Sequence, residues 1–214
     1  MNITIFRSRT GALIKQKLFP QLLAQLPDSL QGRAHRYQSE LSAYNYVIGR
    51  LLLKRGLDSL GCSTDLEKIE FSENGKPILS DIYFNISHSD QQVICGLSKE
   101  GVIGIDLEKM APIDFEDFTS MFSAAEWDAI KGADDSLRAF YWFWTRKESI
   151  IKALGWNLSY LHEIELDVSL DHFVVNGKRW FLREVFIEEG FIGSVCCEGE
   201  IGAVEVRDHC FLNH

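Results

Sequence analysis

The sequence has little of what marks several large classes of protein. No apolar run approaches the length of a membrane span, and no low-complexity segment or linker interrupts the chain. Positive charge is also scarce, because 22 Lys and Arg residues face 31 Asp and Glu residues, for a formal net charge of −9. That balance argues against nucleic acid or an anionic membrane as the main partner. With 214 residues, the chain can form one large domain or two small ones.

The cysteines are few and irregularly spaced. Their number is odd, two of them are adjacent, and none shows the C-x-x-C spacing of a metal or redox site. They are Cys62, Cys95, Cys196, Cys197 and Cys210. The segment "MNITIFRSRTG" also lacks the apolar core of a secretion signal. We therefore expect reduced thiols and a cytoplasmic protein.

What is present is an ordinary globular composition, with 46% hydrophobic and 25% charged residues. Apolar periodicity predicts helices, of which 39–57 is the strongest, with Ser39 as N-cap and Gly56 as stop. The predicted helices are 12–26, 39–57, 115–122, 124–131 and 135–155. The predicted strands are 2–6, 68–72, 83–87, 92–98, 102–108, 163–168, 172–176, 179–187, 190–197 and 201–207. We expect 92–98 and 102–108 to pair as a hairpin, and the whole to be an α+β protein of two related halves joined near residue 100.

The stretch "VIGIDLEKM" (102–110) places two acids inside a strand pattern. Residues two apart in a strand share a face, so the Cα atoms of Asp106 and Glu108 are expected to lie roughly 6.5 Å apart. Two carboxylates that close repel each other. A third acid, Glu148, falls on the aromatic stripe of "FYWFWTRKESIIKALG" (140–155), with Lys152 one turn later. A surface Glu–Lys pair is the ordinary alternative, but a carboxylate among aromatics needs a partner.

Two further stretches offer groups suited to phosphate. "FNISHSD" (84–90) ends a strand with Ser87 and His88, and "NGKP" (74–77) presents Lys76 on a turn stiffened by Pro77. A polar strand end and a solvated loop lysine are the structural alternatives. Mg²⁺ is held by a few carboxylates together with substrate phosphate oxygens. The combination therefore indicates a Mg²⁺-dependent enzyme that acts on a phosphoanhydride.

Five motifs in order resemble the 4′-phosphopantetheinyl transferases of the long, surfactin-synthetase (Sfp) type. They are "GKP" (75–77), "FNISHS" (84–89), "IGIDLE" (103–108), "FSAAEW" (122–127) and "WTRKESIIKALG" (144–155). The resemblance implies a pseudo-dimer of two similar α+β halves, 1–100 and 101–214, with coenzyme A in the cleft between them. It implies transfer of phosphopantetheine from coenzyme A to a serine of an apo acyl or peptidyl carrier protein, releasing adenosine 3′,5′-bisphosphate, as in a holo-[acyl-carrier-protein] synthase. We expect a monomer.

Carried over residue by residue, the resemblance makes Asp106, Glu108 and Glu148 the Mg²⁺ ligands. It assigns coenzyme A binding to four residues and to a lysine that would also neutralise or protonate the leaving phosphate. They are Lys76, Pro77, Ser87 and His88, together with Lys152. Glu148 or a metal-bound water is expected to act as the general base for the serine proton. Glu126 lies where the family often has an acid that helps to deprotonate the acceptor, although Ser-x-x-Glu is equally a capping box with Ser123.

One position departs from the family pattern. Members often have an arginine in the helix 39–57 that binds the 3′-phosphate of coenzyme A, and here that position is Asn45. Arg33, Arg36 or Arg50 would have to replace it. The carrier protein is expected to dock on a local patch, for which the apolar segment 110–122 is a candidate; its structural alternative is simple core packing. A nucleotide pyrophosphohydrolase and a non-catalytic carrier-protein binder are the rival functions.

Overall fold

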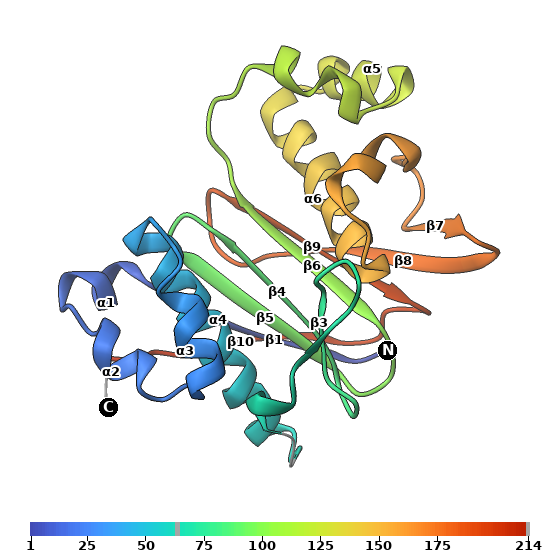
Figure 1. Ribbon diagram of the computed structural model, residues 1–214. Coiled ribbons are helices and arrows are strands. Elements are labelled where there is room, and N and C mark those ends of the chain that lie inside the picture. Colours follow the sequence, from blue (N-terminus) through green and yellow to red (C-terminus); the bar gives the residue numbers. More distant parts are fainter. Residues whose placement is uncertain (63–64, 213–214) are drawn as a thin grey trace.

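The computed structural model describes residues 1–62 and 65–212 as a mixed α+β protein (Figure 1). Its first four-stranded sheet has the order β10-β1-β5-β4, and its second has the order β6-β9-β8-β7. The strands of the first sheet are β1 (Ile3–Arg9), β4 (Tyr83–Ser89), β5 (Gln92–Ser98) and β10 (Val204–Asp208). Those of the second are β6 (Ile103–Lys109), β7 (His172–Val175), β8 (Lys178–Val185) and β9 (Phe191–Glu198). The α+β class expected from the sequence is confirmed.

Each sheet carries a long helix on its outer face. Helix α4 (Glu40–Ser59) packs on β1, β4 and β5, and helix α6 (Ser136–Leu154) packs on β6 and β9 (Figure 1). Ser39 caps α4 through a hydrogen bond from the backbone N–H of Ser42, as the sequence predicts, but the helix continues past Gly56. A third apolar cluster joins the inner faces of the two sheets, with Ile5 and Ile94 from the first sheet. The layers therefore run helix, sheet, sheet, helix.

The two parts of the chain share one connectivity. Each begins with a strand, continues through the long helix, and ends in a hairpin. The last strand of that hairpin pairs with the strand that begins the same part, so β5 pairs with β1 and β9 pairs with β6. The order is β1-β5-β4 in the first sheet and β6-β9-β8 in the second. Two short strands, β2 (Glu70–Phe71) and β3 (Pro77–Ile78), form a separate flap. Strand β10 then returns to pair with β1 in parallel.

The remaining helices are short. They are α1 (Gly11–Lys15), α2 (Phe19–Leu23), α3 (Asp28–Ala34) and α5 (Ala124–Gly132), with 3-10 turns η1 (Leu66–Lys68), η2 (Phe115–Met121) and η3 (Leu158–Glu163). The helix predicted over 12–26 is wrong in its length, because Lys17 has a positive φ and a new helix begins at Phe19, with Pro20 in its first turn. In the described residues no helix is long and apolar enough to cross a membrane. All five cysteines are free thiols.

Two predictions about strands are wrong. Strands β5 and β6 do not form a hairpin, because β5 pairs with β1 and β4 whereas β6 pairs with β9 in the other sheet. The tight link through Gly101 instead carries the chain from one sheet to the next. The segment 163–168 is not a strand; it follows η3 and supplies Ile164 and Leu166 to the apolar core around α6.

Candidate active site

The acids singled out on two distant segments are brought together because α6 lies directly on β6. At Gly104 the two elements almost touch: a Cβ atom built there would lie 2.0 Å from the Ser149 carbonyl oxygen and 2.4 Å from the Ala153 nitrogen. Only a glycine permits this approach. It places Glu148 and Lys152 of α6 beside Asp106 of β6.

Lys152 is the centre of the cluster. Its ammonium lies 2.5 Å from Asp106 Oδ1 and 3.9 Å from Glu148 Oε2, and it donates to Ser87 Oγ at 3.1 Å. Desolvation acts against the charged ammonium, but the carboxylates of Asp106 and Glu148 outweigh it and raise the pKa of Lys152. Lys152 is therefore a fixed positive charge at neutral pH.

The carboxylates around Lys152 are crowded and partly withdrawn from water. Burial raises the pKa of Glu148 to about 7, with Asp106 and Glu108 adding to the effect against Lys152. Burial and the neighbouring Asp106 likewise raise the pKa of Glu108 to about 6. Glu148 is thus poised to accept or release a proton near neutral pH.

The donor chemistry of this cluster suits Mg²⁺. Asp106 Oδ2 is buried and has no hydrogen-bond partner among the described residues, so a buried anionic oxygen is left facing the cluster. Asp106, Glu108 and Glu148 together supply the hard oxygen ligands that Mg²⁺ prefers. The donor types fit, but the three carboxylates are not gathered around one point, since no group of three or more His, Cys, Asp or Glu side chains within 1–62 and 65–212 is arranged to hold a metal ion.

The residues expected to bind phosphate lie around this cluster. Ser87 Oγ donates to Asp106 Oδ1 at 2.9 Å and accepts from the backbone N–H of Leu107, so its single proton is already in use. His88 is the next residue of β4, and its pKa is lowered by desolvation and then by the positive charge of Lys152. It therefore lies close enough to Lys152 to sense its charge.

Lys76 approaches from the β2–β3 flap. Its ammonium donates to the Ala153 carbonyl at the end of α6 at 2.8 Å, and burial lowers its pKa to about 8. Beside it, Pro77 and apolar side chains from both sheets line a cavity of about 190 Å³. Two of the three ammonium protons of Lys76 remain for a ligand.

Glu126 stands apart from the cluster. The capping-box alternative is confirmed, because Ser123 and Glu126 exchange the two bonds that define it at the start of α5. Glu126 Oε2 also lies 2.6 Å from the Lys147 ammonium, and Oε1 accepts from the Leu166 backbone N–H at 2.9 Å. Both side chains of the pair are buried. A catalytic role would require Glu126 to leave these bonds.

Asn45 is likewise committed to the structure. Its side chain accepts a hydrogen bond from Thr10 Oγ1 at 3.1 Å and donates to the Asp90 carbonyl at 2.9 Å. Five residues later, Arg50 is only 8% exposed and lies 4.7 Å from the ring centroid of Tyr46. Neither Arg50 Nε nor the Tyr46 hydroxyl has a hydrogen-bond partner in the part of the chain that is described.

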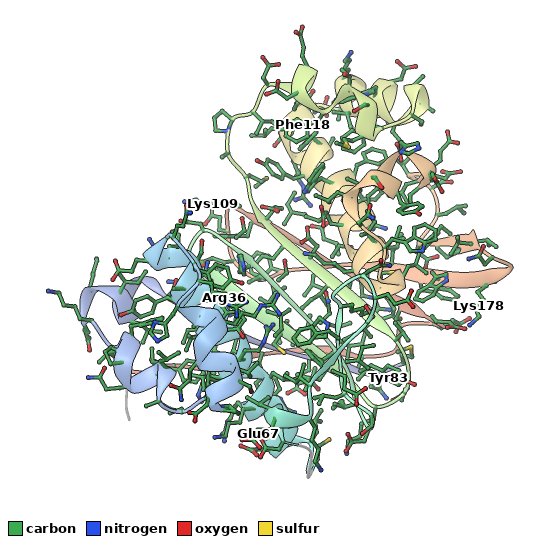
Figure 2. All side chains as sticks on the ribbon, viewed as in Figure 1. Arg36, Glu67, Tyr83, Lys109, Phe118 and Lys178 are labelled. Carbon is green, nitrogen blue, oxygen red and sulfur yellow. The ribbon has the colours of Figure 1, made fainter. Side chains whose placement is uncertain are left out.

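The apolar segment 110–122 packs mainly inward. Phe122 is buried, and the remaining large apolar residues pack against the core around α6. Those partly buried residues are Met110, Ile113, Phe115, Phe118 and Met121. Figure 2 shows Phe118 at the end of the molecule formed by α5 and α6, away from Tyr83. Core packing is therefore the better interpretation for these side chains.

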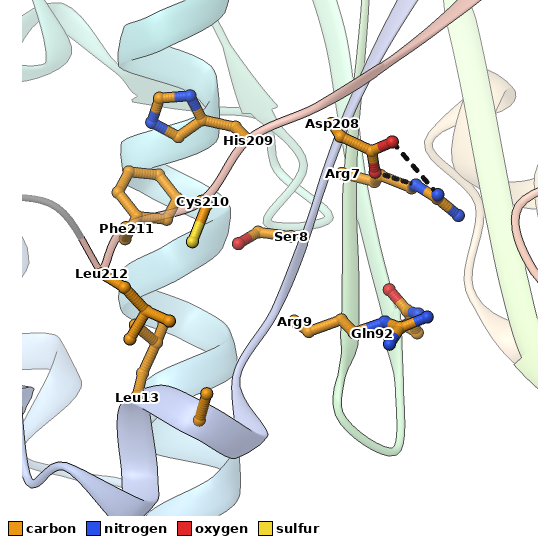
Figure 3. Close-up of a pocket in the computed structure, with 11 residues that line it drawn as sticks. Arg7, Ser8, Arg9, Leu13, Gln92, Asp208, His209, Cys210, Phe211 and Leu212 are labelled. Carbon is orange, nitrogen blue, oxygen red and sulfur yellow. Dashed lines mark hydrogen bonds and ion pairs between the residues drawn. The ribbon is translucent and has the colours of Figure 1, made fainter.

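A different cavity, of about 390 Å³, lies between the C-terminal segment and β1 (Figure 3). Its principal charged groups are already paired: Arg7 with Asp208, and Arg9 with Glu188. Cys210, Phe211 and Leu212 form its other wall. It shares no residue with the carboxylate cluster, which we take as the candidate active site.

The sequence interpretation missed Asn85, Ser89 and Gly104. Ser89 Oγ donates to Glu108 Oε2 at 2.7 Å, and Asn85 Oδ1 accepts from the Ile105 backbone N–H at 2.9 Å. A signal for the serines was present in the sequence. Polar residues alternate in "NISHS" (85–89) and acids alternate in "IDLEK" (105–109), so two neighbouring strands with these sequences can place one polar side chain beside each acid. The only sequence signal for Gly104 was its position inside an apolar strand, where a glycine often marks the close approach of another backbone segment.

The site thus joins Asp-x-Glu on strand β6 to Glu-x-x-x-Lys on helix α6, which packs on that strand. The family model of the 4′-phosphopantetheinyl transferase superfamily matches residues 102–201. The 4′-phosphopantetheinyl transferase AcpT of Salmonella typhimurium is 35% identical over 141 residues, which cover 61% of this chain and 67% of AcpT. The chain therefore belongs to the 4′-phosphopantetheinyl transferase superfamily.

Two other relatives extend the comparison. The 4′-phosphopantetheinyl transferase gsp of Aneurinibacillus migulanus is 35% identical over 147 residues, covering 66% of this chain and 61% of that protein. The 4′-phosphopantetheinyl transferase HetI of Nostoc sp. is 28% identical over 191 residues, covering 83% and 81%. For gsp, and for further relatives of the same family, the chain spans only about six tenths of their length.

Proposed function

We propose that the chain transfers 4′-phosphopantetheine from coenzyme A to a serine hydroxyl of an apo acyl or peptidyl carrier protein, as a holo-[acyl-carrier-protein] synthase does. The observation that carries this proposal is the contact of Lys152 with Asp106 and Ser87, beside Glu148. It joins a positive charge suited to a phosphate with crowded carboxylates. The names of the relatives given above support the reaction class.

In the reaction, the serine oxygen of the carrier forms a bond to the phosphorus that bears pantetheine. The bond from that phosphorus to the bridging oxygen breaks, and its electrons leave with adenosine 3′,5′-bisphosphate. Glu148 takes the serine proton. Lys152 neutralises the charge that develops on the leaving phosphate.

Asp106, Glu108 and Glu148 would hold Mg²⁺, and the buried Asp106 Oδ2 is the oxygen that most needs a cation. Bound there, Mg²⁺ would neutralise the charge of the pyrophosphate oxygens. Lys76 would supply a second positive charge from the flap, and we assign His88 and Ser87 to the same phosphates. Pro77 shapes the cavity beside Lys76.

We also propose that residues 1–100 and 101–214 form the two related halves, with coenzyme A between them. The shared strand order of the two sheets supports the relation. The position of Lys76, which reaches from the first half to the Ala153 carbonyl of the second, supports a ligand at their junction. The chain then needs no second copy to complete its site, and it acts as a cytoplasmic monomer.

Arg50 is the basic residue that we assign to the 3′-phosphate of coenzyme A. It is a buried cation beside Tyr46; its Nε and the Tyr46 hydroxyl have no hydrogen-bond partner by distance and angle among the described residues, and its positive charge contributes to lowering the pKa of His88. Asn45 cannot take this role because both ends of its amide are in use. Arg33, which stacks on Phe71, and Arg36 lie farther toward the surface.

Intact mass measurement tests the transfer directly. Candidate apo carriers are incubated with the protein, coenzyme A and Mg²⁺, and a gain of one phosphopantetheine group on the carrier serine is expected. Glu148→Ala and Asp106→Ala should lower the rate by roughly 10²–10⁴-fold while the fold survives. The exposed Glu163→Ala serves as control. Hydrolysis of coenzyme A without carrier would instead identify a pyrophosphohydrolase.

The assignment of Arg50 is tested by titration with coenzyme A and 3′-dephospho-coenzyme A. Wild type should bind coenzyme A roughly tenfold more tightly, because a charge-assisted bond contributes about 1.5 kcal/mol or more. Arg50→Ala should lose this preference, whereas Arg33→Ala and Arg36→Ala should keep it. Equal binding of both ligands by wild type would show that no basic residue holds the 3′-phosphate.

A further inference from the structure

Strands β4 and β6 are neighbours without sharing a backbone ladder, since they belong to different sheets. Three backbone N–H groups of β6 instead donate to side chains of β4. Ile105 donates to Asn85 at 2.9 Å, Leu107 to Ser87 at 3.3 Å and Lys109 to Ser89 at 3.0 Å. Each pair is 20 residues apart, so the two strands run parallel. Figure 2 shows Tyr83 at the start of β4 and Lys109 at the end of β6, at opposite ends of this seam.

The two serines of the seam also donate to the acids of β6. Ser87 Oγ donates to Asp106 Oδ1 at 2.9 Å, and Ser89 Oγ donates to Glu108 Oε2 at 2.7 Å. A hydroxyl has one proton and two lone pairs, so accepting from the strand and donating to the acid uses the proton and fixes its direction. Each serine is therefore anchored to the β6 backbone while it holds one carboxylate oxygen of β6.

We propose that Ser89 is a positioning residue for Glu108, and that it orients this carboxylate toward the cation site as Ser87 orients Asp106. The proposal rests on the function proposed above, in which Glu108 is a ligand of Mg²⁺. Residues two apart in a strand share a face, so with Oε2 held by Ser89 the other oxygen of Glu108 is left for a ligand on the side of Asp106. The hydrogen bonds of Ser89 go to Glu108 and to the Lys109 backbone, whereas Lys152 donates to Ser87.

The need for such a residue follows from the position of Glu108. Its side chain is less buried than that of Asp106, it lies near the end of β6, and the charge of Asp106 repels it. Asp106 is held by both Ser87 and Lys152, whereas Glu108 is held by the hydrogen bond from Ser89 and by the Trp144 side chain on the facing helix. Without Ser89, Glu108 would keep only its contact with Trp144, and its carboxylate would be free to turn away from Asp106. Partners that orient metal ligands typically contribute 10–100-fold to metal affinity.

The experiment measures Mg²⁺ affinity of the full chain by calorimetry, with urea unfolding of every variant. Ser89→Ala should weaken Mg²⁺ binding by roughly 10–100-fold, and Ser89→Thr, which keeps the hydroxyl, should restore most of the affinity. Ser80→Ala is the matched control, because Ser80 also donates to a neighbouring carboxylate, Asp81, but lies outside the site. A purely structural role of Ser89 would lower the urea midpoint without changing the Mg²⁺ affinity of the folded protein.

Glu108→Gln distinguishes a failure of the role proposed for Ser89 from a failure of the assignment of Glu108 as a Mg²⁺ ligand. If Glu108→Gln weakens Mg²⁺ binding but a folded Ser89→Ala does not, the role of Ser89 is wrong and the metal assignment stands. If Glu108→Gln leaves Mg²⁺ binding unchanged, Glu108 is not a ligand and both assignments are overturned. Should Ser89→Ala fail to fold, Ser89→Cys keeps the volume with a weaker donor, and wild-type affinity in that variant would also refute the proposal.

Discussion

Replacing Gly104 by alanine is the sharpest test of how the site is assembled. The new Cβ would lie 2.0 Å from the Ser149 carbonyl oxygen, and ordinary contact begins near 3.4 Å. Because the obstacle is helix backbone and not a flexible side chain, α6 has to move away from β6 by about 1.4 Å. A displacement of that size takes the 2.5 Å contact between Lys152 and Asp106 beyond hydrogen-bond range.

Two quantities should change together in Gly104→Ala. Overpacking of a close contact costs about 1–3 kcal/mol, so the free energy of unfolding measured in urea should fall by that amount. Misplacement of catalytic groups by about 1 Å costs roughly 100-fold, so the rate of carrier modification should fall to about 1% of wild type in the folded fraction.

Gly32→Ala is the matched control, since a Cβ at Gly32 in α3 would meet nothing within 4 Å. That variant should keep wild-type transfer and gain up to about 1 kcal/mol of stability, as glycine-to-alanine changes in helices do. Wild-type transfer and stability in Gly104→Ala would show that the contact of α6 with β6 does not set the geometry of the site.

Three further outcomes are expected. Coenzyme A binding should weaken as pH rises through about 8, because Lys76 then loses its proton, and Lys76→Arg should flatten this dependence in calorimetric titrations. The stability change has the opposite sign: the folded pKa of Lys76 lies below its ordinary value of 10.5, so deprotonation above pH 8 relieves the cost of burying the charge. Glu126→Gln should lower the free energy of unfolding by roughly 3 kcal/mol in urea, because Lys147 is left buried without its anion, while transfer per folded molecule stays near wild type. Loss of transfer without loss of stability would make Glu126 catalytic. Asn45→Ala should lower the free energy of unfolding by about 1–3 kcal/mol, because two buried hydrogen bonds are lost, without changing the preference for coenzyme A over its 3′-dephospho form. Loss of that preference would show that Asn45 binds the 3′-phosphate.

Much of the fold followed from local pattern. Helix α6 was predicted to within one residue at each end, because its aromatic stripe and Gly155, which adopts the left-handed conformation at the C-cap, are local signals. The family and the pairing of Glu148 with Lys152 could be anticipated for the same reason. The hairpin between β5 and β6 was wrong because a short polar link with glycine looks the same whether the strands pair or separate.

The site could be anticipated in its residues but not in its bonds. Periodicity placed Asp106 and Glu108 on one face, yet it could not show that β4 lies alongside and supplies a serine to each acid. The structural commitments of Glu126 and Asn45 were equally hidden, since Lys147, Leu166, Thr10 and Asp90 reach them only through tertiary packing. The spacing of residues predicts which side chains share a face of one helix or strand. It does not predict hydrogen bonds between different elements, and these bonds are of that kind.

Strand β10 has a consequence for how the protein is made. Ile3 of β1 pairs with Val204, so the first sheet is completed by a strand synthesised about 200 residues later. Until then β1 has β5 on one side and an unpaired edge on the other, which is a template for association between nascent chains. During translation the first sheet consequently cannot be completed before the second, whose last strand, β9, ends at Glu198. Chains that stop before residue 204 should accumulate as aggregates, however complete their carboxylate cluster is.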